Sequence, residues 1–160
     1  MTLITNDFSI LIVEDEEPKL NAIRAFLFDD FPMINVSIAK SLTSAISELS
    51  NKEFDFCIID MSLPTYDFEV DKTGGGKPQT EGGTEILRFM ESECPGLKAA
   101  VLTQYNEFAT LDGSVLSIED LRHNLTQEFS DNLLAVIYYS GQKAEWRSEL
   151  KKLLEVYSFD

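Results

Sequence analysis

The sequence predicts an α/β protein built on one parallel β-sheet, with helices on both faces of the sheet. Three observations favour this fold class. Five short apolar segments alternate along the chain with five segments whose apolar residues recur at helical spacing. The strand-sized segments are mostly apolar without interruption, as strands buried on both faces are. Strands that alternate with helices in this way are usually joined as parallel neighbours by right-handed crossovers.

A group of acidic residues lies between the first predicted strand and the first predicted helix. The strand, residues 10–13, is a continuous apolar run that ends at Glu14 and Asp15. Pro18 then begins a helix, because proline costs nothing at a first helical position, where its missing N–H would have no intrahelical partner. The apolar face of this helix consists of Leu20, Ile23 and Leu27.

The second and third strands follow the same pattern. Residues 36–39 form the second predicted strand, and Ser41 is the expected N-cap of the helix after it. Residues 56–59 form the third strand, which stops at Asp60. Two of the first three strands therefore end in carboxylates.

The rest of the chain contains two strands and three helices. A glycine-rich loop covers residues 63–83, and Thr84 is the expected cap of the third helix. Residues 99–102 form a fourth strand that ends at Thr103. A less regular stretch leads to Ser117, the expected cap of the fourth helix. The fifth strand and the last helix are expected at residues 133–139 and at about 144–157.

Length and composition are those of one globular domain. The chain has 160 residues, of which 44% are hydrophobic and 26% charged. We expect a leader at residues 1–7 and a single domain at residues 8–160. No apolar run approaches the length that spans a bilayer, and no signal peptide is evident, so a cytoplasmic protein without membrane attachment is expected. Two cysteines in no metal or disulfide pattern fit a reducing compartment.

The charge balance argues against a nucleic-acid partner. Asp and Glu total 28 against 13 Lys and Arg, which gives a net charge of −15. A surface of this sign repels a phosphate backbone. No separate basic domain is expected either, so any effector would be another protein chain.

The carboxylates at the strand ends predict a metal site. Ligands of open α/β sheets bind beyond the carboxyl ends of the strands, where Glu14, Asp15 and Asp60 are expected to converge. Carboxylates so close together repel one another, and a divalent cation removes that repulsion. Mg²⁺ suits such a site because it prefers oxygen ligands and keeps several of its waters. The metal would leave one carboxylate as a nucleophile toward a phosphoryl group.

Three motifs resemble those of response-regulator receiver domains. LIVEDEE is similar to the first strand and acidic pair of a receiver, CIIDMSLP to the strand that is phosphorylated, and AAVLT to the fourth strand with its terminal hydroxyl. The motifs occur in the receiver order, and the resemblance extends from Ile10 to about Tyr157. It implies a flavodoxin-like three-layer sandwich, with a five-stranded parallel sheet of order 2-1-3-4-5.

The resemblance also implies a role for each motif residue. Asp60 would be the phosphoacceptor. Asp15 would bind Mg²⁺ directly, Glu14 largely through water, and Ser62 through its backbone carbonyl. Thr103 would hydrogen-bond the phosphoryl group. A histidine kinase or a phosphotransfer protein would supply the phosphoryl group, and an unidentified protein effector would respond to it. The protein would be a receiver without an output domain, or a phosphate relay or sink, and its oligomeric state stays open.

The sequence departs from the receiver pattern at the end of the fifth strand. Receivers usually carry a lysine there, followed by proline, and this lysine pairs with the acyl phosphate. Here the strand reads AVIYYSG, which places Tyr139 at the lysine position. A second register places Lys143 there. In the first register, Lys143 would either reach the site from the loop or, as we prefer, be a solvated lysine at the start of the last helix. Gln104, where receivers have a small residue, would either screen Asp60 or position a water.

Two insertions are predicted relative to receivers. One lies at about 65–81 and contains Gly74, Gly75 and Gly76; it would be a lid, a partner loop or a tolerated surface insertion. The other lies at about 105–118 and changes the approach to the fourth helix. Because receivers commonly dimerise or meet partners near that helix, the usual dimer is not assumed.

Two other functions compete with the phosphorylated receiver. The missing strand-five lysine favours a phosphorylation-independent pseudo-receiver that acts as a protein-interaction module. A phosphatase with an aspartate nucleophile would need a second aspartate two residues after Asp60, but Ser62 occupies that place and is no general acid at neutral pH. The protein is therefore not expected to be an enzyme, beyond catalysing its own phosphorylation and dephosphorylation.

Overall fold

A parallel sheet forms the centre of the molecule. The computed structural model describes residues 8–66, 82–105, 107–109 and 113–157. The sheet strands are β1 (Ser9–Val13), β2 (Asn35–Ala39), β3 (Phe56–Ile59), β4 (Lys98–Thr103) and β7 (Leu133–Tyr138). The helices are α1 (Glu17–Asp30), α2 (Leu42–Asn51), α3 (Gly82–Glu93), α4 (Ile118–Glu128) and α5 (Glu145–Tyr157). Two further strands, β5 (Glu107–Ala109) and β6 (Val115–Ser117), precede α4.

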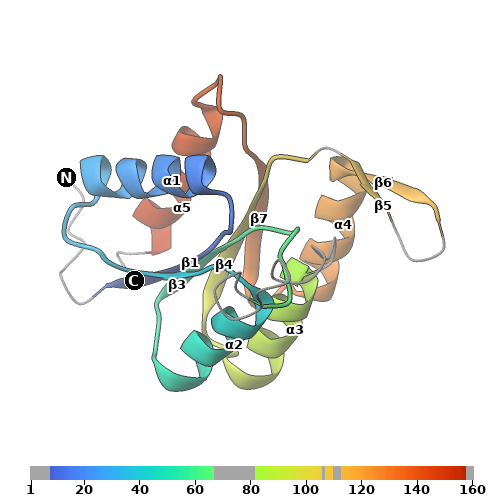
Figure 1. Cartoon of the computed structure of the whole chain (residues 1–160), viewed down its shortest axis with the longest axis horizontal. Coiled ribbons are helices and arrows are strands. Elements are labelled where there is room, and N and C mark those ends of the chain that lie inside the picture. Colours follow the sequence, from blue (N-terminus) through green and yellow to red (C-terminus); the bar gives the residue numbers. More distant parts are fainter. Residues whose placement is uncertain (1–7, 67–81, 106, 110–112, 158–160) are drawn as a thin grey trace.

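The strand order confirms the predicted topology. The sheet runs β2-β1-β3-β4-β7, and every neighbouring pair is parallel. Because β7 is the fifth strand of this sheet, the order corresponds to the predicted 2-1-3-4-5. The two additional strands pair antiparallel in a separate hairpin, which projects beside α4 in Figure 1. The hairpin lies within the second predicted insertion, where the sequence indicated only an irregular stretch.

The helices form the two outer layers of the predicted sandwich. Helices α1 and α5 cover one face of the sheet, and α2, α3 and α4 cover the other (Figure 1). Side chains alternate between the faces along each strand: Ile10 and Ile12 of β1 pack with α1 and α5, whereas Leu11 and Val13 pack with the other helices. All four are fully buried, which explains why the strand is apolar without interruption.

The predicted helix caps are confirmed in two of three cases. Ser41 and Ser117 each accept a hydrogen bond from the backbone three residues later, in a capping box. The prediction for Thr84 is wrong, because α3 already begins at Gly82. Gly82 and Gly83 therefore belong to the first turn of the helix and not to the loop before it.

The amino-terminal end of α3 packs closely against the chain that follows β3. Gly83 donates its backbone N–H to the Met61 carbonyl at 3.0 Å. A Cβ at Gly83 would lie 2.7 Å from the Asp60 carbonyl oxygen and 3.0 Å from the Met61 Cα. Only glycine permits so close an approach, and the backbone beside Asp60 is fixed by it.

The predicted leader and most of the first predicted insertion lie outside the described residues. These are residues 1–7 and 67–81, which include Gly74, Gly75 and Gly76. The beginning of that insertion is anchored, because Pro64 and Thr65 accept backbone hydrogen bonds from the first turn of α2. Of the helices in the described part of the chain, none has the length and apolarity needed to cross a membrane.

The glycine contact leads to a stability prediction. We expect Gly83→Ala to lower the free energy of unfolding by about 1–3 kcal/mol, because the added methyl group overlaps backbone atoms that cannot move freely. Gly96→Ala is the matched control, since a Cβ there meets nothing within 4 Å. Urea unfolding of both variants measures the difference, and equal stabilities would contradict the close packing described for α3.

Candidate functional site

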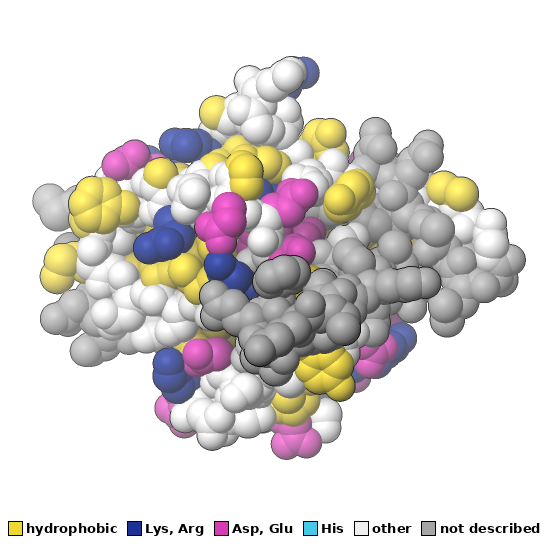
Figure 2. All heavy atoms as spheres, viewed as in Figure 1, with side chains coloured by type: hydrophobic (Ala, Val, Ile, Leu, Met, Phe, Trp, Pro, Cys, Tyr) yellow, Lys and Arg dark blue, Asp and Glu magenta, His cyan; other side chains and the backbone are white. Residues whose placement is uncertain are grey.

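Three carboxylates converge at the carboxyl edge of the sheet, as predicted. Strands β1 and β3 are neighbours, with Val13 in register with Ile59, so the residues that follow them lie side by side. One oxygen from each of Glu14, Asp15 and Asp60 lies within 4.8 Å of the others. Figure 2 shows acidic side chains gathered near the centre of the view, beside the amino-terminal end of α1.

Glu14 points into the protein. Its Oε2 accepts hydrogen bonds from the backbone N–H groups of Asp15 and Glu16, both at 3.1 Å. Its side chain is almost fully buried. The chain thus turns tightly around this carboxylate between β1 and α1. Asp15 is half-buried and remains accessible to a ligand from solvent.

Asp60 is also buried, with 4% of its surface exposed. Its backbone N–H donates to the Val13 carbonyl at 3.0 Å, which extends the β1–β3 pairing beyond the strand end. Its Oδ1 accepts a hydrogen bond from the Met61 N–H at 2.9 Å. Among the described residues, none donates a hydrogen bond to Oδ2.

The sequence interpretation missed Lys19, which is buried among these carboxylates. Its Nζ lies 2.6 Å from Glu14 Oε1 and 3.2 Å from Asp60 Oδ1. It also donates to the backbone carbonyl of Leu102, near the end of β4, at 2.5 Å. The side chain is 2% exposed. A single ammonium group therefore contacts the carboxyl ends of three strands.

One signal in the sequence points to Lys19. It lies four residues before Ile23 and seven before Phe26, both of which are buried on the face of α1 that packs on the sheet. A lysine on the apolar face of a helix is almost never buried without a partner. The partners follow from the topology, because α1 begins directly after the acidic end of β1.

Burial dominates the electrostatics of the cluster. It raises the pKa of Glu14 to about 7, against the lowering effect of Lys19, while the charge of Asp60 adds to the rise. Burial is also the main reason that the pKa values of Asp15 and Asp60 are raised. With all four groups charged, three carboxylates and one ammonium leave a net charge of −2.

The donor set fits a divalent cation such as Mg²⁺. The three carboxylates lie close enough to share one ion, and carboxylate oxygens are its preferred ligands. A charge of +2 would balance the net charge of the cluster. Glu14 Oε1 is buried and accepts no hydrogen bond of regular geometry from the described residues, although Lys19 lies beside it. Asp15 is the carboxylate most open to solvent.

The other predicted site residues near the strand ends are Thr103, Ser62 and Gln104. Thr103 is the last residue of β4 and fully buried, and its Oγ1 accepts a hydrogen bond from the Tyr105 N–H at 3.3 Å. Ser62 is half-buried in the loop after β3. Gln104 is half-buried directly beyond β4.

Tyr139 and Lys143 differ in their relation to the cluster. Tyr139 follows β7, and its N–H donates to the Thr103 carbonyl at 2.8 Å. Its ring centroid lies 5.7 Å from Lys19 Nζ, so the aromatic side chain is within cation–π distance of the buried ammonium. Lys143 lies exposed between β7 and α5, and no ion pair joins it to a described carboxylate.

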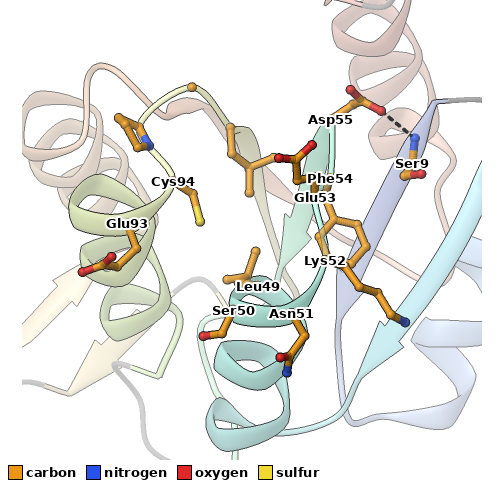
Figure 3. A pocket seen from close by; sticks show the side chains of 13 residues that line it. Ser9, Leu49, Ser50, Asn51, Lys52, Glu53, Phe54, Asp55, Glu93 and Cys94 are labelled. Atoms are coloured by element: carbon orange, nitrogen blue, oxygen red, sulfur yellow. Dashed lines mark hydrogen bonds between the residues drawn. The ribbon is translucent and has the colours of Figure 1, made fainter.

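A separate pocket lies at the opposite edge of the sheet. It has a volume of about 580 Å³ and is formed where α2 and α3 end and β3 begins (Figure 3). A hydrogen bond from the Ser9 N–H to Asp55 Oδ2, at 2.8 Å, closes one side. The pocket is at the amino ends of the strands, so it does not belong to the acidic cluster.

The raised pKa of Glu14 gives a pH prediction. Between about pH 4.5 and 7, folded Glu14 keeps a proton that the unfolded chain has lost, so the free energy of unfolding should fall as pH rises through this window. Glu14→Gln should flatten that dependence, because glutamine does not titrate. Chemical denaturation in EDTA measures the slope. Glu53→Gln, which removes a charge at an exposed position, is the control and should keep the wild-type slope.

Comparisons with known proteins agree with this architecture. No protein-family model matches the chain. A curated relative, the Detocs response regulatory protein DtcB of Enterobacter cloacae, is 24% identical over 149 residues, which cover 92% of this chain and 99% of the relative. A CheY-like receiver domain protein from Methanospirillum hungatei superimposes with a TM-score of 0.60 and 22% identity, over 95% of this chain and 94% of that one.

A second similar structure was solved as a complex with ligands. It is the response regulator TrrA of Thermotoga maritima in complex with Mg²⁺ and a beryllium fluoride, with a TM-score of 0.60, 19% identity, and coverage of 92% of this chain and 99% of that one. The resemblance that the motifs predicted is therefore confirmed. The chain has the flavodoxin-like fold of the CheY-like receiver domains of response regulators.

Proposed function

We propose that the protein is a response regulator that accepts a phosphoryl group on Asp60 with the help of Mg²⁺ and signals through protein–protein contacts. One observation carries this proposal. In a receiver fold, three carboxylates and a buried ammonium meet at the carboxyl edge of the sheet, where ligands of such sheets bind.

The acidic residues would bind the metal, and Thr103 would contact the phosphoryl group on Asp60. Asp15 and Asp60 would bind Mg²⁺ through carboxylate oxygens, Ser62 through its backbone carbonyl, and Glu14 through water. A bound divalent cation supplies positive charge that offsets the charge of the phosphoryl oxygens. Thr103 would donate its hydroxyl to a phosphoryl oxygen, since it ends the strand next to β3.

Asp60 would act as the nucleophile, and the contacts of its two oxygens support this role. Met61 and Lys19 hold one of its oxygens in position, whereas Oδ2 accepts no hydrogen bond from a described residue. A carboxylate held in this way keeps a lone pair for attack on phosphorus. The protein would catalyse only its own phosphorylation and dephosphorylation and would not act as an enzyme on other substrates.

The partners would be proteins. A histidine kinase or a phosphotransfer protein would supply the phosphoryl group, and a protein effector would bind the phosphorylated form. The curated relative that matches along nearly its whole length is named a response regulatory protein, which supports this role. The net charge of −15 supports the exclusion of nucleic acid from the partners.

The phosphorylation-independent module remains the second candidate. Its main support is Tyr139 at the place where receivers carry a lysine. Lys19 weakens that support, because it brings an ammonium group to 3.2 Å from Asp60 by another route. We therefore favour phosphoryl acceptance.

The first test concerns Asp60. Wild-type protein incubated with Mg²⁺ and acetyl phosphate should gain the mass of one phosphoryl group, measured by intact mass spectrometry, and Asp60→Asn should gain none. Asp55→Asn is the matched control, because Asp55 lies at the other end of the same strand and should not affect labelling. Labelling of Asp60→Asn equal to wild type would exclude Asp60 as the acceptor.

The second test concerns the metal. Mg²⁺ should raise the free energy of unfolding, by about 2.7 kcal/mol at a concentration one hundred times its dissociation constant, because it binds the folded chain only. Asp15→Asn should lose most of this gain, and Glu53→Gln should keep it. The measurement is urea unfolding with and without Mg²⁺; an equal gain in Asp15→Asn would argue against Asp15 as a ligand.

A further inference from the structure

We infer that Lys19 of α1 is the cation that contacts the phosphoryl group on Asp60, in place of the lysine that receivers usually carry at the end of the fifth strand. The inference rests on the proposed function of Asp60 and adds to it a phosphoryl-binding residue on a different element. Three features of the structure carry it.

The first feature is the position of the ammonium group. Lys19 is the only lysine or arginine that is buried among the described residues. Its Nζ lies 3.2 Å from Oδ1 of Asp60, the residue that would be phosphorylated. It also lies 2.5 Å from the carbonyl oxygen of Leu102, the residue before Thr103. It therefore lies between the ends of β3 and β4, beside the place where a phosphoryl group on Asp60 would be held.

The second feature is the residue at the usual lysine position. Tyr139 is hydrogen-bonded to the end of β4 and turns its ring toward Lys19, with the centroid 5.7 Å from Nζ. The ring also packs on Trp146, with 5.2 Å between the centroids. The aromatic ring of Tyr139 therefore lies at cation–π distance from the Lys19 ammonium group.

The third feature is that Lys19 makes more contacts than the pairing with Glu14 requires. It lies in the first turn of α1, where the helix dipole disfavours a positive charge. It is also buried, and a buried ammonium is costly unless it is paired. Glu14 provides one pairing, but Lys19 also contacts Asp60 and reaches the end of β4, beyond what a simple ion pair with Glu14 requires.

In the proposed phosphoryl transfer, Lys19 acts as a hydrogen-bond donor. An oxygen of the Asp60 carboxylate attacks the phosphorus of acetyl phosphate and forms an O–P bond. The bond between phosphorus and the acetyl oxygen breaks, and acetate leaves with the electron pair. Lys19 transfers no proton in this step and moves a hydrogen bond from Asp60 Oδ1 to a phosphoryl oxygen. Such charge-assisted bonds are the strong ones, and they stabilise charge that develops on the phosphoryl group.

The experiment removes the ammonium group of Lys19 and then introduces a lysine at position 139, directly after β7. The rate of phosphorylation by acetyl phosphate with Mg²⁺ is followed by intact mass for Lys19→Met, for the double variant Lys19→Met/Tyr139→Lys, and for Lys52→Met as an exposed control. Lys19→Met should be slower by about 100-fold, as on loss of a donor to a reacting oxygen, and Lys52→Met should match wild type. The double variant should be faster than Lys19→Met; a rate no faster counts against the inference.

A second pair of variants separates a binding role from a purely structural one. Lys19→Met leaves buried carboxylates without a counter-charge and can fail to fold, whereas Glu14→Gln/Lys19→Met removes both members of the main ion pair. Its phosphorylation rate is compared with that of Glu14→Gln alone. A much lower rate in the double variant supports the inference, and equal rates overturn it.

Fluorescence gives a readout that does not depend on phosphoryl transfer. Trp146 is the single tryptophan of the chain and contacts Tyr139, which lies over Lys19. Beryllofluoride with Mg²⁺ should change its emission in Glu14→Gln but not in Glu14→Gln/Lys19→Met. The same change in both would contradict the inference. If wild type takes no phosphoryl group at all, the proposed function fails; if only the Lys19 comparisons show no difference, the inference alone fails.

Discussion

The ion pairs of Lys19 with Glu14 and Asp60 are the interaction on which the site depends. Burying either carboxylate alone would cost several kcal/mol, and burying both side by side would cost more. The ammonium group lies 2.6 Å from one and 3.2 Å from the other and offsets part of that cost. It also hydrogen-bonds the end of β4, so it joins α1 to three strands of the sheet.

Lys19 does not neutralise the cluster completely. Three carboxylates and one ammonium retain negative charge, and burial still raises the pKa of Glu14 to about 7. The fold thus tolerates a site that is more favourable with a divalent cation than without one. Close backbone contacts preserve this arrangement: the Met61 N–H donates to Asp60, and Gly83 packs directly against the backbone of Asp60 and Met61.

Local patterns predicted most of the fold because each depends on residues close together in the chain. The apolar runs gave the strands within one or two residues of their observed ends, and Ser41 and Ser117 cap their helices as expected. Thr84 failed as a cap because Gly82 and Gly83 can enter the helix while packing against the loop after β3. That contact joins segments separated by a long insertion, and no local pattern reports it. The β5–β6 hairpin was missed for a different reason, because its strands have only three residues each.

The sequence by itself determined the fold class and the acidic cluster, and its resemblance to receivers implied the strand order. It did so because strands that end in carboxylates bring them to one edge whenever the strands are parallel neighbours. Only the tertiary structure decided which cation lies there. Receivers usually carry a lysine at the end of the fifth strand, and this sequence has Tyr139 at that position. The structure provides Lys19 from α1, because the long side chain of a lysine reaches from the first turn of that helix across the strand ends. Such a reach depends on how a helix packs on a sheet, which spacing along the chain does not specify.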